Sequence, residues 1–225
     1  MMVISLTQRF FLCTETGSES VDIRDEKGMF GLVAAALLEL DLDLSGCVCI
    51  EKKKVRACAP LSEGCAPLAP LYNYIRRKGP LSVGKIARAS FVKDILLPPL
   101  PNDSLSWQLR QSVGTALELR GLAQSRDGKK ALFLPKPEAV QAEFAELRAT
   151  LIDRTLPLDG DTAALALLLD KMGVLAERFS AADCQKMRAL LTQAAQREEN
   201  AAVLLAMQHF ERLWKLNTAL AFLPW

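Results

Sequence analysis

The sequence predicts a mainly α-helical fold: a single-domain helical bundle around buried central helices, with two short β-hairpins. Three observations favour this fold. Half of the residues are hydrophobic and only 6% are aromatic, with Leu and Ala prominent, a composition typical of helices. Residues 32–40 are apolar nearly all round except for Glu39, as in a buried central helix. A helix followed by glycine and a hairpin occurs twice, and no extended linker divides the 225 residues, so one domain covering 1–225 is expected.

Two hairpins are predicted, each directly after a helix and a glycine. The first follows the central helix 28–40, where Gly46 stands at a position that often requires a left-handed residue. Residues 47–50 then alternate like a short strand. The second has an Asp-Gly turn signal. The predicted hairpins are 47–58, with its turn at 51–54, and 122–134, with Asp127 and Gly128 in its turn.

The remaining elements are read from local signals. Residues 5–13 form a short buried element of uncertain type, and 14–28 is a polar connection. Three prolines within 59–70 argue against regular structure there. Each further helix is indicated by a capping residue or proline at its start, or by glycine or proline after its end. These helices are 71–78, 82–89, 105–120, 137–151, 162–176, 181–197 and 198–222.

Composition excludes several classes of protein. The formal net charge of +2 offers no strong field for nucleic acid, so no nucleic-acid partner is expected. Six cysteines are too few for a disulfide framework and indicate a reducing cytosol. Residues 1–12 carry Gln8 and Arg9 inside their apolar run, unlike a signal peptide. Charges interrupt every apolar run short of the ~20 residues that span a bilayer. A cytoplasmic protein is expected, with any membrane contact peripheral.

Four cysteines, Cys47, Cys49, Cys58 and Cys65, raise the alternative of a metal-binding or redox module. Structural zinc sites usually take their ligands from C-x₂₋₄-C pairs. On a strand, Cys47-x-Cys49 only places two thiols on one face. Cysteine is also often buried as a small hydrophobic residue. Core packing is therefore the preferred interpretation, and no metal or cofactor is predicted.

No residue pattern typical of an active site occurs. His209 is the only histidine and has no nucleophile near it in the sequence, so it is interpreted as an ordinary helix residue with one exposed face. Phosphate-binding loops, dinucleotide fingerprints and nucleophile elbows are absent. The acidic pairs Asp41 with Asp43 and Asp159 with Asp161 fit a helix end and a helix N-cap. The protein is predicted not to be an enzyme.

Basic residues gather at three places. Such runs usually form solvated faces, but several on one face would suit an anionic lipid surface. The apolar strand 131–134 beside Lys129 and Lys130 could enter the headgroup layer as an amphipathic anchor. Alternatively, this hairpin packs on the core or docks a partner chain. The three groups are Lys52–Lys54 with Arg56, Arg126 with Lys129 and Lys130, and Arg76–Lys78 next to Tyr72 and Tyr74.

Several motifs, in order and spacing, resemble the Golgi phosphoprotein 3 family. The similarity covers about residues 5–191 and leaves the helix 198–225 beyond the matched region. It implies a single, mostly helical domain with hairpins. It also implies binding of phosphatidylinositol 4-phosphate and an adaptor role without catalysis, as in the eukaryotic members. The motifs are Leu6-Thr7 before Phe10-Phe11-Leu12, Leu37-Leu38-Glu39-Leu40, Gly46 with the strand after it, Trp107 to Arg110, Leu119 to Leu122, Leu132-Phe133-Leu134, Asp161 to Leu169 and Gly173 to Leu175.

The family's headgroup pocket combines a Trp before the first central helix, a basic residue early in that helix and two basic residues on a later helix. By resemblance, the two later positions fall on Trp107 and Arg110, so one basic residue is kept. The family's Trp position falls on Arg24 or Glu26. Its early basic position falls on an apolar residue, either Val33 or Ala35.

The resemblance thus implies a lipid headgroup site formed by Arg110, Trp107 and Arg24. The membrane-contacting hairpin would be Lys129, Lys130, Leu132 and Phe133.

Two functions of different classes follow from these observations. The first is binding of an anionic phospholipid or phosphoinositide headgroup by a peripheral membrane adaptor. The alternative is a non-enzymatic protein-interaction scaffold that forms homo-oligomers through its hairpins or the helix 198–225. The apolar stripe of that helix would suit self-association or docking onto a partner, and equally packing within the domain.

Overall fold

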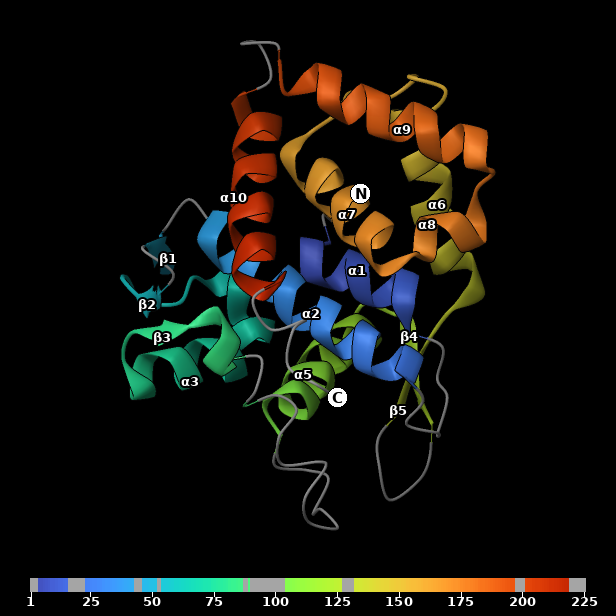
Figure 1. The fold of residues 1–225 in the computed structure, drawn as a ribbon. Coiled ribbons are helices and arrows are strands. Elements are labelled where there is room, and N and C mark those ends of the chain that lie inside the picture. Colours follow the sequence, from blue (N-terminus) through green and yellow to red (C-terminus); the bar gives the residue numbers. More distant parts are fainter. Residues whose placement is uncertain are drawn as a thin grey trace.

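The computed structural model describes residues 4–15, 23–42, 46–51, 54–86, 89, 104–126, 132–196 and 201–218. Helices make up most of this structure, and two small antiparallel sheets complete it, so the predicted fold class is confirmed (Figure 1). The helices are α1 (Leu6–Thr14), α2 (Ile23–Leu42), α3 (Ala69–Lys78), α5 (Leu105–Leu119), α6 (Pro137–Leu151), α7 (Gly160–Met172), α8 (Val174–Arg178), α9 (Ala181–Ala194) and α10 (Ala201–Thr218), with a 3₁₀ helix, η1, at Glu63–Leu68. The strands are β1 (Val48–Glu51), β2 (Lys54–Ala57), β3 (Leu81–Ser82), β4 (Ala123–Arg126) and β5 (Leu132–Pro135).

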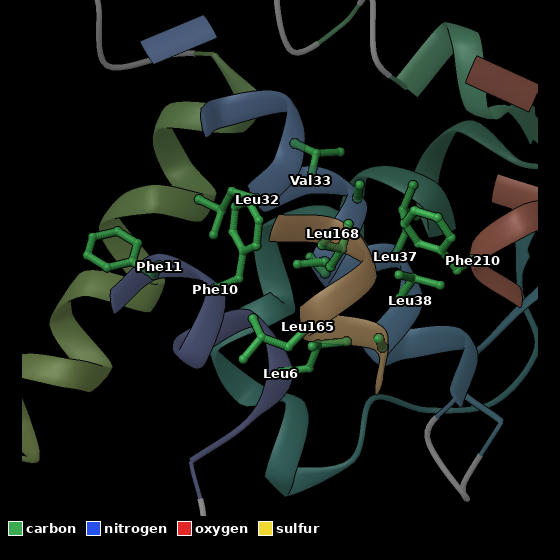
Figure 2. Packing of buried hydrophobic residues seen from close by; sticks show 14 of the residues in the cluster. Leu6, Phe10, Phe11, Leu32, Val33, Leu37, Leu38, Leu165, Leu168 and Phe210 are labelled. Carbon is green, nitrogen blue, oxygen red and sulfur yellow. The ribbon is translucent and has the colours of Figure 1, made fainter. Parts of the chain in front are cut away.

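Helix α2 is the buried centre of the fold, as predicted. It contacts α1, α5, α7 and α10, so apolar side chains are needed on every side of it. Gly31 allows a close approach of α1 to α2, because a Cβ there would lie 2.3 Å from Cζ of Phe10 in α1. Figure 2 shows the resulting cluster, in which Leu37 and Leu38 of α2 are joined by side chains of α1, α7 and α10.

The short buried element predicted at 5–13, whose type the sequence left open, is helix α1. Leu6 and Phe10 are buried in the central cluster. The first turn of α1 is held by α2, because the Thr7 backbone N–H donates to Oε2 of Glu39 at 2.8 Å. Burial raises the pKa of Glu39, and its hydrogen bonds to Thr7 oppose this rise. Glu39, the single charged residue within 32–40 of α2, therefore satisfies a backbone N–H at the N-terminus of α1.

Helix α7 is the second buried helix, and its ends follow local chemistry. Its N-cap Asp159 accepts a hydrogen bond from the Thr162 backbone N–H at 2.7 Å, as predicted. The predicted end at 176 is wrong. Gly173 has φ +82° and ends α7, and the short helix α8 begins at the next residue. The apolar residues after Gly173 continue the hydrophobic pattern without continuing the helix.

Both predicted hairpins form, on different sides of the helical body (Figure 1). In the first, Cys49 lies opposite Arg56, and a third strand joins because Val55 pairs with Leu81. The helix predicted from Ser82 is thus preceded by strand β3, which includes Ser82 itself. The stretch 59–70 was expected to be irregular, but it contains the 3₁₀ helix η1, whose tighter turn accommodates Pro67.

The described part of the C-terminal helix belongs to the core. Helix α10 packs on α7 and α2, and its residues Ala206 and Phe210 are buried. His209 of α10 forms a hydrogen bond through Nδ1 with the side chain of Asp41 near the end of α2. Asp41 also accepts the backbone N–H of Ile50 at 3.2 Å. The expectation that His209 is an ordinary helix residue therefore misses its pairing, which joins α10 to α2 and β1.

Candidate anion-binding surface

The outer face of the first half of α5 carries the residues predicted for headgroup binding. The N-cap Ser104 accepts the Trp107 backbone N–H at 3.2 Å and starts the helix. Leu105 and Leu109 are buried against the core. With 3.6 residues per turn, Trp107 and Arg110 then lie on the opposite, outward side. Both are only partly exposed.

Trp107 and Arg110 contact each other on the surface of α5. The Arg110 guanidinium carbon lies 5.7 Å from the centroid of the Trp107 ring, within the range of a cation–π interaction. The guanidinium thus lies over the face of the indole ring. Their i, i+3 spacing on one helix is what brings them together.

Arg110 also forms a bidentate ion pair that local sequence reasoning misses. Its Nε donates to Oε2 of Glu15 at 2.8 Å, and its Nη2 donates to Oε1 of the same carboxylate. Both side chains are 12% exposed, so the pair is largely shielded from water. The two residues are 95 positions apart in the chain, and Glu15 lies directly after α1 in a stretch expected to be a surface connection. Nothing in its local pattern indicates this contact.

Arg24, the third predicted headgroup residue, lies in the first turns of α2. Its side chain lies outside the part of the chain that the structure describes. Its convergence with Arg110 and Trp107 therefore stays a prediction.

Phe133 of the second hairpin points into the protein. It is 3% exposed, and a Cβ on Gly114 of α5 would lie 2.3 Å from its ring atom Cδ2. The prediction that Phe133 enters the membrane is therefore wrong for this structure, because its ring is buried against α5. Lys129, Lys130 and the side chain of Leu132 lie outside the described residues. Helix α5 contacts both strands of this hairpin.

The four cysteines near the first hairpin divide into a buried and an exposed pair. Cys47 and Cys65 are buried. Cys49 is half-buried and Cys58 is exposed. A hydrogen bond between these two thiols and burial together raise the pKa of Cys49 to about 11, so its thiol is protonated at neutral pH. Among the described residues, no three or more His, Cys, Asp or Glu side chains are placed to hold a metal ion.

A buried ionic cluster joins α1 to α6 and α7. Arg9 is 5% exposed, and its Nε donates to Oε2 of Glu143 at 2.8 Å. Its remaining nitrogens donate to Thr162 Oγ1 at 3.0 Å and Glu146 Oε1 at 2.8 Å. Burial raises the pKa of Glu143, and the charge of Arg9 opposes this rise. The hydrogen bonds of this cluster are satisfied inside the protein, so we interpret it as a structural link between helices. The outer face of α5 is therefore the candidate binding surface.

The fold and this surface define a class of protein: a mainly helical domain with two hairpins and an Arg–Trp pair on the outer face of helix α5. The chain belongs to the Golgi phosphoprotein 3 family, whose sequence model matches residues 6–210. The match extends into α10, beyond the limit of about 191 expected from the motifs. A search of curated proteins finds no relative that matches the chain. Within the described residues, no helix is long and apolar enough to cross a membrane.

Proposed function

We propose that the protein is a non-catalytic adaptor that binds membranes peripherally, by holding the phosphorylated headgroup of an anionic lipid at Arg110 and Trp107. The observation that carries this proposal is the bidentate pairing of Arg110 with Glu15, where the same guanidinium also lies over the Trp107 ring. A guanidinium presents the same pair of parallel N–H groups to a carboxylate and to a phosphate. Glu15 therefore occupies the place that a headgroup phosphate would take.

The exchange of Glu15 for a phosphate is favourable on electrostatic grounds. A phosphomonoester carries about −1.5 to −2 charges at pH 7, whereas a carboxylate carries one. Release of Glu15 would return a charge to water, where it is well solvated. Arg24 is proposed to add a second guanidinium, and Lys129, Lys130 and Leu132 to add charge and apolar contact from the neighbouring hairpin. Each basic residue near an anionic surface contributes about 1 kcal/mol.

Liposome co-sedimentation tests the proposal. The vesicles are phosphatidylcholine with and without phosphatidylinositol 4-phosphate, each at a low and a high salt concentration. The wild-type chain is expected to pellet with the phosphorylated lipid, less at high salt because the attraction is screened. Arg110→Gln should abolish most of this pelleting, and Glu15→Gln should increase it.

A matched control is Arg148→Gln. Arg148 is also ion-paired, with Asp183 at 3.4 Å, but on α6 and α9 rather than on α5. Removing the same charge there should leave pelleting unchanged. Negligible pelleting with every vesicle would defeat the proposal, as would equal losses for Arg110→Gln and Arg148→Gln.

The scaffold alternative has less support. Self-association through the C-terminal helix needs an apolar face that is free, whereas Ala206 and Phe210 of α10 are buried within the same chain. Light scattering of the full chain measures this alternative directly. A stable oligomer that persists in Arg110→Gln would favour it.

A further inference from the structure

Helix α3 presents an outer face that the headgroup site does not use. Its inner face is anchored, because Leu71 and Ile75 are buried in the core. Tyr72 adds a polar anchor, since its hydroxyl donates to the Ala59 carbonyl at 2.7 Å. With the inner face fixed in this way, Asn73, Arg76 and Arg77 are left exposed on the outside of the helix.

An open hollow of about 570 Å³ lies between α3 and α5, which pack side by side (Figure 1). Pro70, Asn73 and Arg77 recur at helical spacing and form its α3 wall, with Arg76 beside them and Gln108 of α5 opposite. Its volume is within the range of small-molecule sites.

The chemistry of this hollow selects for an anion. Arg76 and Arg77 each supply a guanidinium, and Asn73 and Gln108 each supply a side-chain amide. Neither α3 nor the α5 turns facing it contain an acidic residue. Within the described part of the chain, Arg76 and Arg77 form no ion pair, in contrast to Arg110. Arg77 Nε donates a weak hydrogen bond to the Asn73 carbonyl at 3.4 Å, and both residues line the hollow.

The hollow is a different site from the Arg110 cluster. Gln108 and Arg110 are two positions apart on α5, so their side chains point about 160° apart around the helix axis, on either side of Trp107. Arg110 turns toward Glu15 after α1, and Gln108 turns toward α3. A substitution in one site therefore leaves the contacts of the other intact.

We propose that the α3–α5 hollow binds a phosphate ester whose organic part carries hydroxyl groups. The two guanidinium groups would take the phosphate oxygens through charge-assisted hydrogen bonds, which are the stronger kind. Asn73 and Gln108 both donate and accept, so their amides suit hydroxyl groups. The hollow is several times larger than one phosphate ion, and this size favours an ester over inorganic phosphate. The same chemistry occurs in a free sugar phosphate and in a phosphorylated lipid headgroup.

Isothermal titration calorimetry tests the free ligand, with glucose 6-phosphate, glucose and inorganic phosphate as probes. Glucose 6-phosphate is expected to bind, more tightly than inorganic phosphate, and glucose is not expected to bind. Arg76→Gln and Arg77→Gln should each weaken binding by about tenfold or more, because each removes charge-assisted hydrogen bonds.

Lys78→Gln is the matched control. It removes the same charge from the same end of α3, but Lys78 does not line the hollow. Its effect should stay below about threefold, as for a screened surface charge. Circular dichroism checks that all three variants fold, which is expected because all three side chains are exposed.

A vesicle arm distinguishes the two sources of the ligand. Vesicles of phosphatidylcholine containing phosphatidylinositol 4-phosphate are pelleted with each variant, with and without excess glucose 6-phosphate. Competition by the sugar phosphate, together with losses in Arg76→Gln and Arg77→Gln, would assign a lipid headgroup to this hollow. Binding of glucose 6-phosphate without any effect on pelleting would assign a free ligand.

Two results would overturn the inference: binding of no phosphorylated probe in either arm, or losses in Lys78→Gln as large as those in Arg76→Gln and Arg77→Gln. Equal affinity for inorganic phosphate and glucose 6-phosphate would overturn the assignment of hydroxyl contacts. The proposed headgroup site is judged separately, by Arg110→Gln, so either site can fail while the other stands.

Discussion

The ring of Phe133 lies directly against the Cα of Gly114, where no larger residue could stand without moving the ring. This contact joins the second hairpin to α5, the helix that carries Trp107 and Arg110. It also determines the direction of the hairpin's side chains. Since successive residues of a strand alternate between its faces, burying Phe133 leaves Leu134 on the other face, where it is partly exposed. Any membrane contact by this hairpin must therefore come from residues other than Phe133.

Gly114→Ala is expected to lower the free energy of unfolding by about 1–3 kcal/mol, because the added methyl overpacks the contact with Phe133. The intrinsic preference of helices for Ala over Gly, up to ~1 kcal/mol, opposes this loss only in part. Gly28→Ala in α2 is the matched control, since a Cβ there meets nothing within 4 Å. Urea unfolding should show that variant unchanged or more stable. Equal stabilisation by both substitutions would show that Phe133 does not pack on Gly114.

Several helix starts were predictable from sequence because their signals are local, but α2 begins at Ile23, within the stretch 14–28 that was expected to be a polar connection. Ser104, Asp159 and Ser180 are helix N-caps. The side-chain oxygen of each accepts a hydrogen bond from the backbone N–H three residues later. The end of α7 was predicted too late because the hydrophobic pattern continues beyond Gly173, and pattern alone does not report a left-handed residue. Likewise, the two-residue period of β5 predicts that its side chains alternate between two faces of the strand. It does not predict which of these faces packs against the core.

The candidate site was predictable only in its local part. Trp107 and Arg110 share one helix face, so their contact follows from spacing. Glu15 was missed because it reaches Arg110 from a distant part of the chain, through the packing of α1 against α5. The hollow beside α3 was missed for the same reason. Its basic residues were noticed, but Gln108 comes from another helix.

Phe210→Ala tests whether α10 is part of the core. Phe210 is 3% exposed, and truncating a buried Phe costs about 3–5 kcal/mol of unfolding free energy. Leu205→Ala is the control on the same helix, because Leu205 is 46% exposed and should lose less than ~1 kcal/mol. Thermal or urea unfolding of both variants provides the comparison. Equally small losses would place α10 outside the cooperative core.

Glu39→Gln should change how stability depends on pH. The pKa of Glu39 in the folded protein is raised above its ordinary value of 4.5, chiefly by burial. The folded state thus binds more protons than the unfolded state between the ordinary and the raised pKa, and stability falls as pH rises through this window. Glutamine keeps an acceptor for the Thr7 N–H and carries no charge, so the variant should lose less stability than the wild type over that range.

Urea unfolding of both proteins from pH 4 upward measures this difference. Glu118 supplies a control of opposite sign. Its pKa is lowered by hydrogen bonds from Ser125, so its contribution is present above 4.5 and disappears as pH falls. Glu118→Gln should therefore lower stability by a similar amount at every pH above 4.5, and this difference from the wild type should shrink only as pH falls below 4.5. A Glu39→Gln curve parallel to the wild type would exclude a raised pKa at Glu39.

Substitutions in the Arg110–Glu15 pair are expected to change the free energy of unfolding and vesicle binding in different ways. Arg110→Gln removes the guanidinium that donates to both oxygens of the mostly buried Glu15 carboxylate, and loss of this pair costs about 3 kcal/mol of unfolding free energy. The double variant Glu15→Gln/Arg110→Gln removes both charges and should recover most of that loss. A double-mutant cycle by urea unfolding gives the coupling energy. On vesicles containing phosphatidylinositol 4-phosphate, however, the double variant should bind as poorly as Arg110→Gln, because restored folding does not restore the guanidinium. Strong vesicle binding by the double variant would show that Arg110 acts only in folding and holds no headgroup.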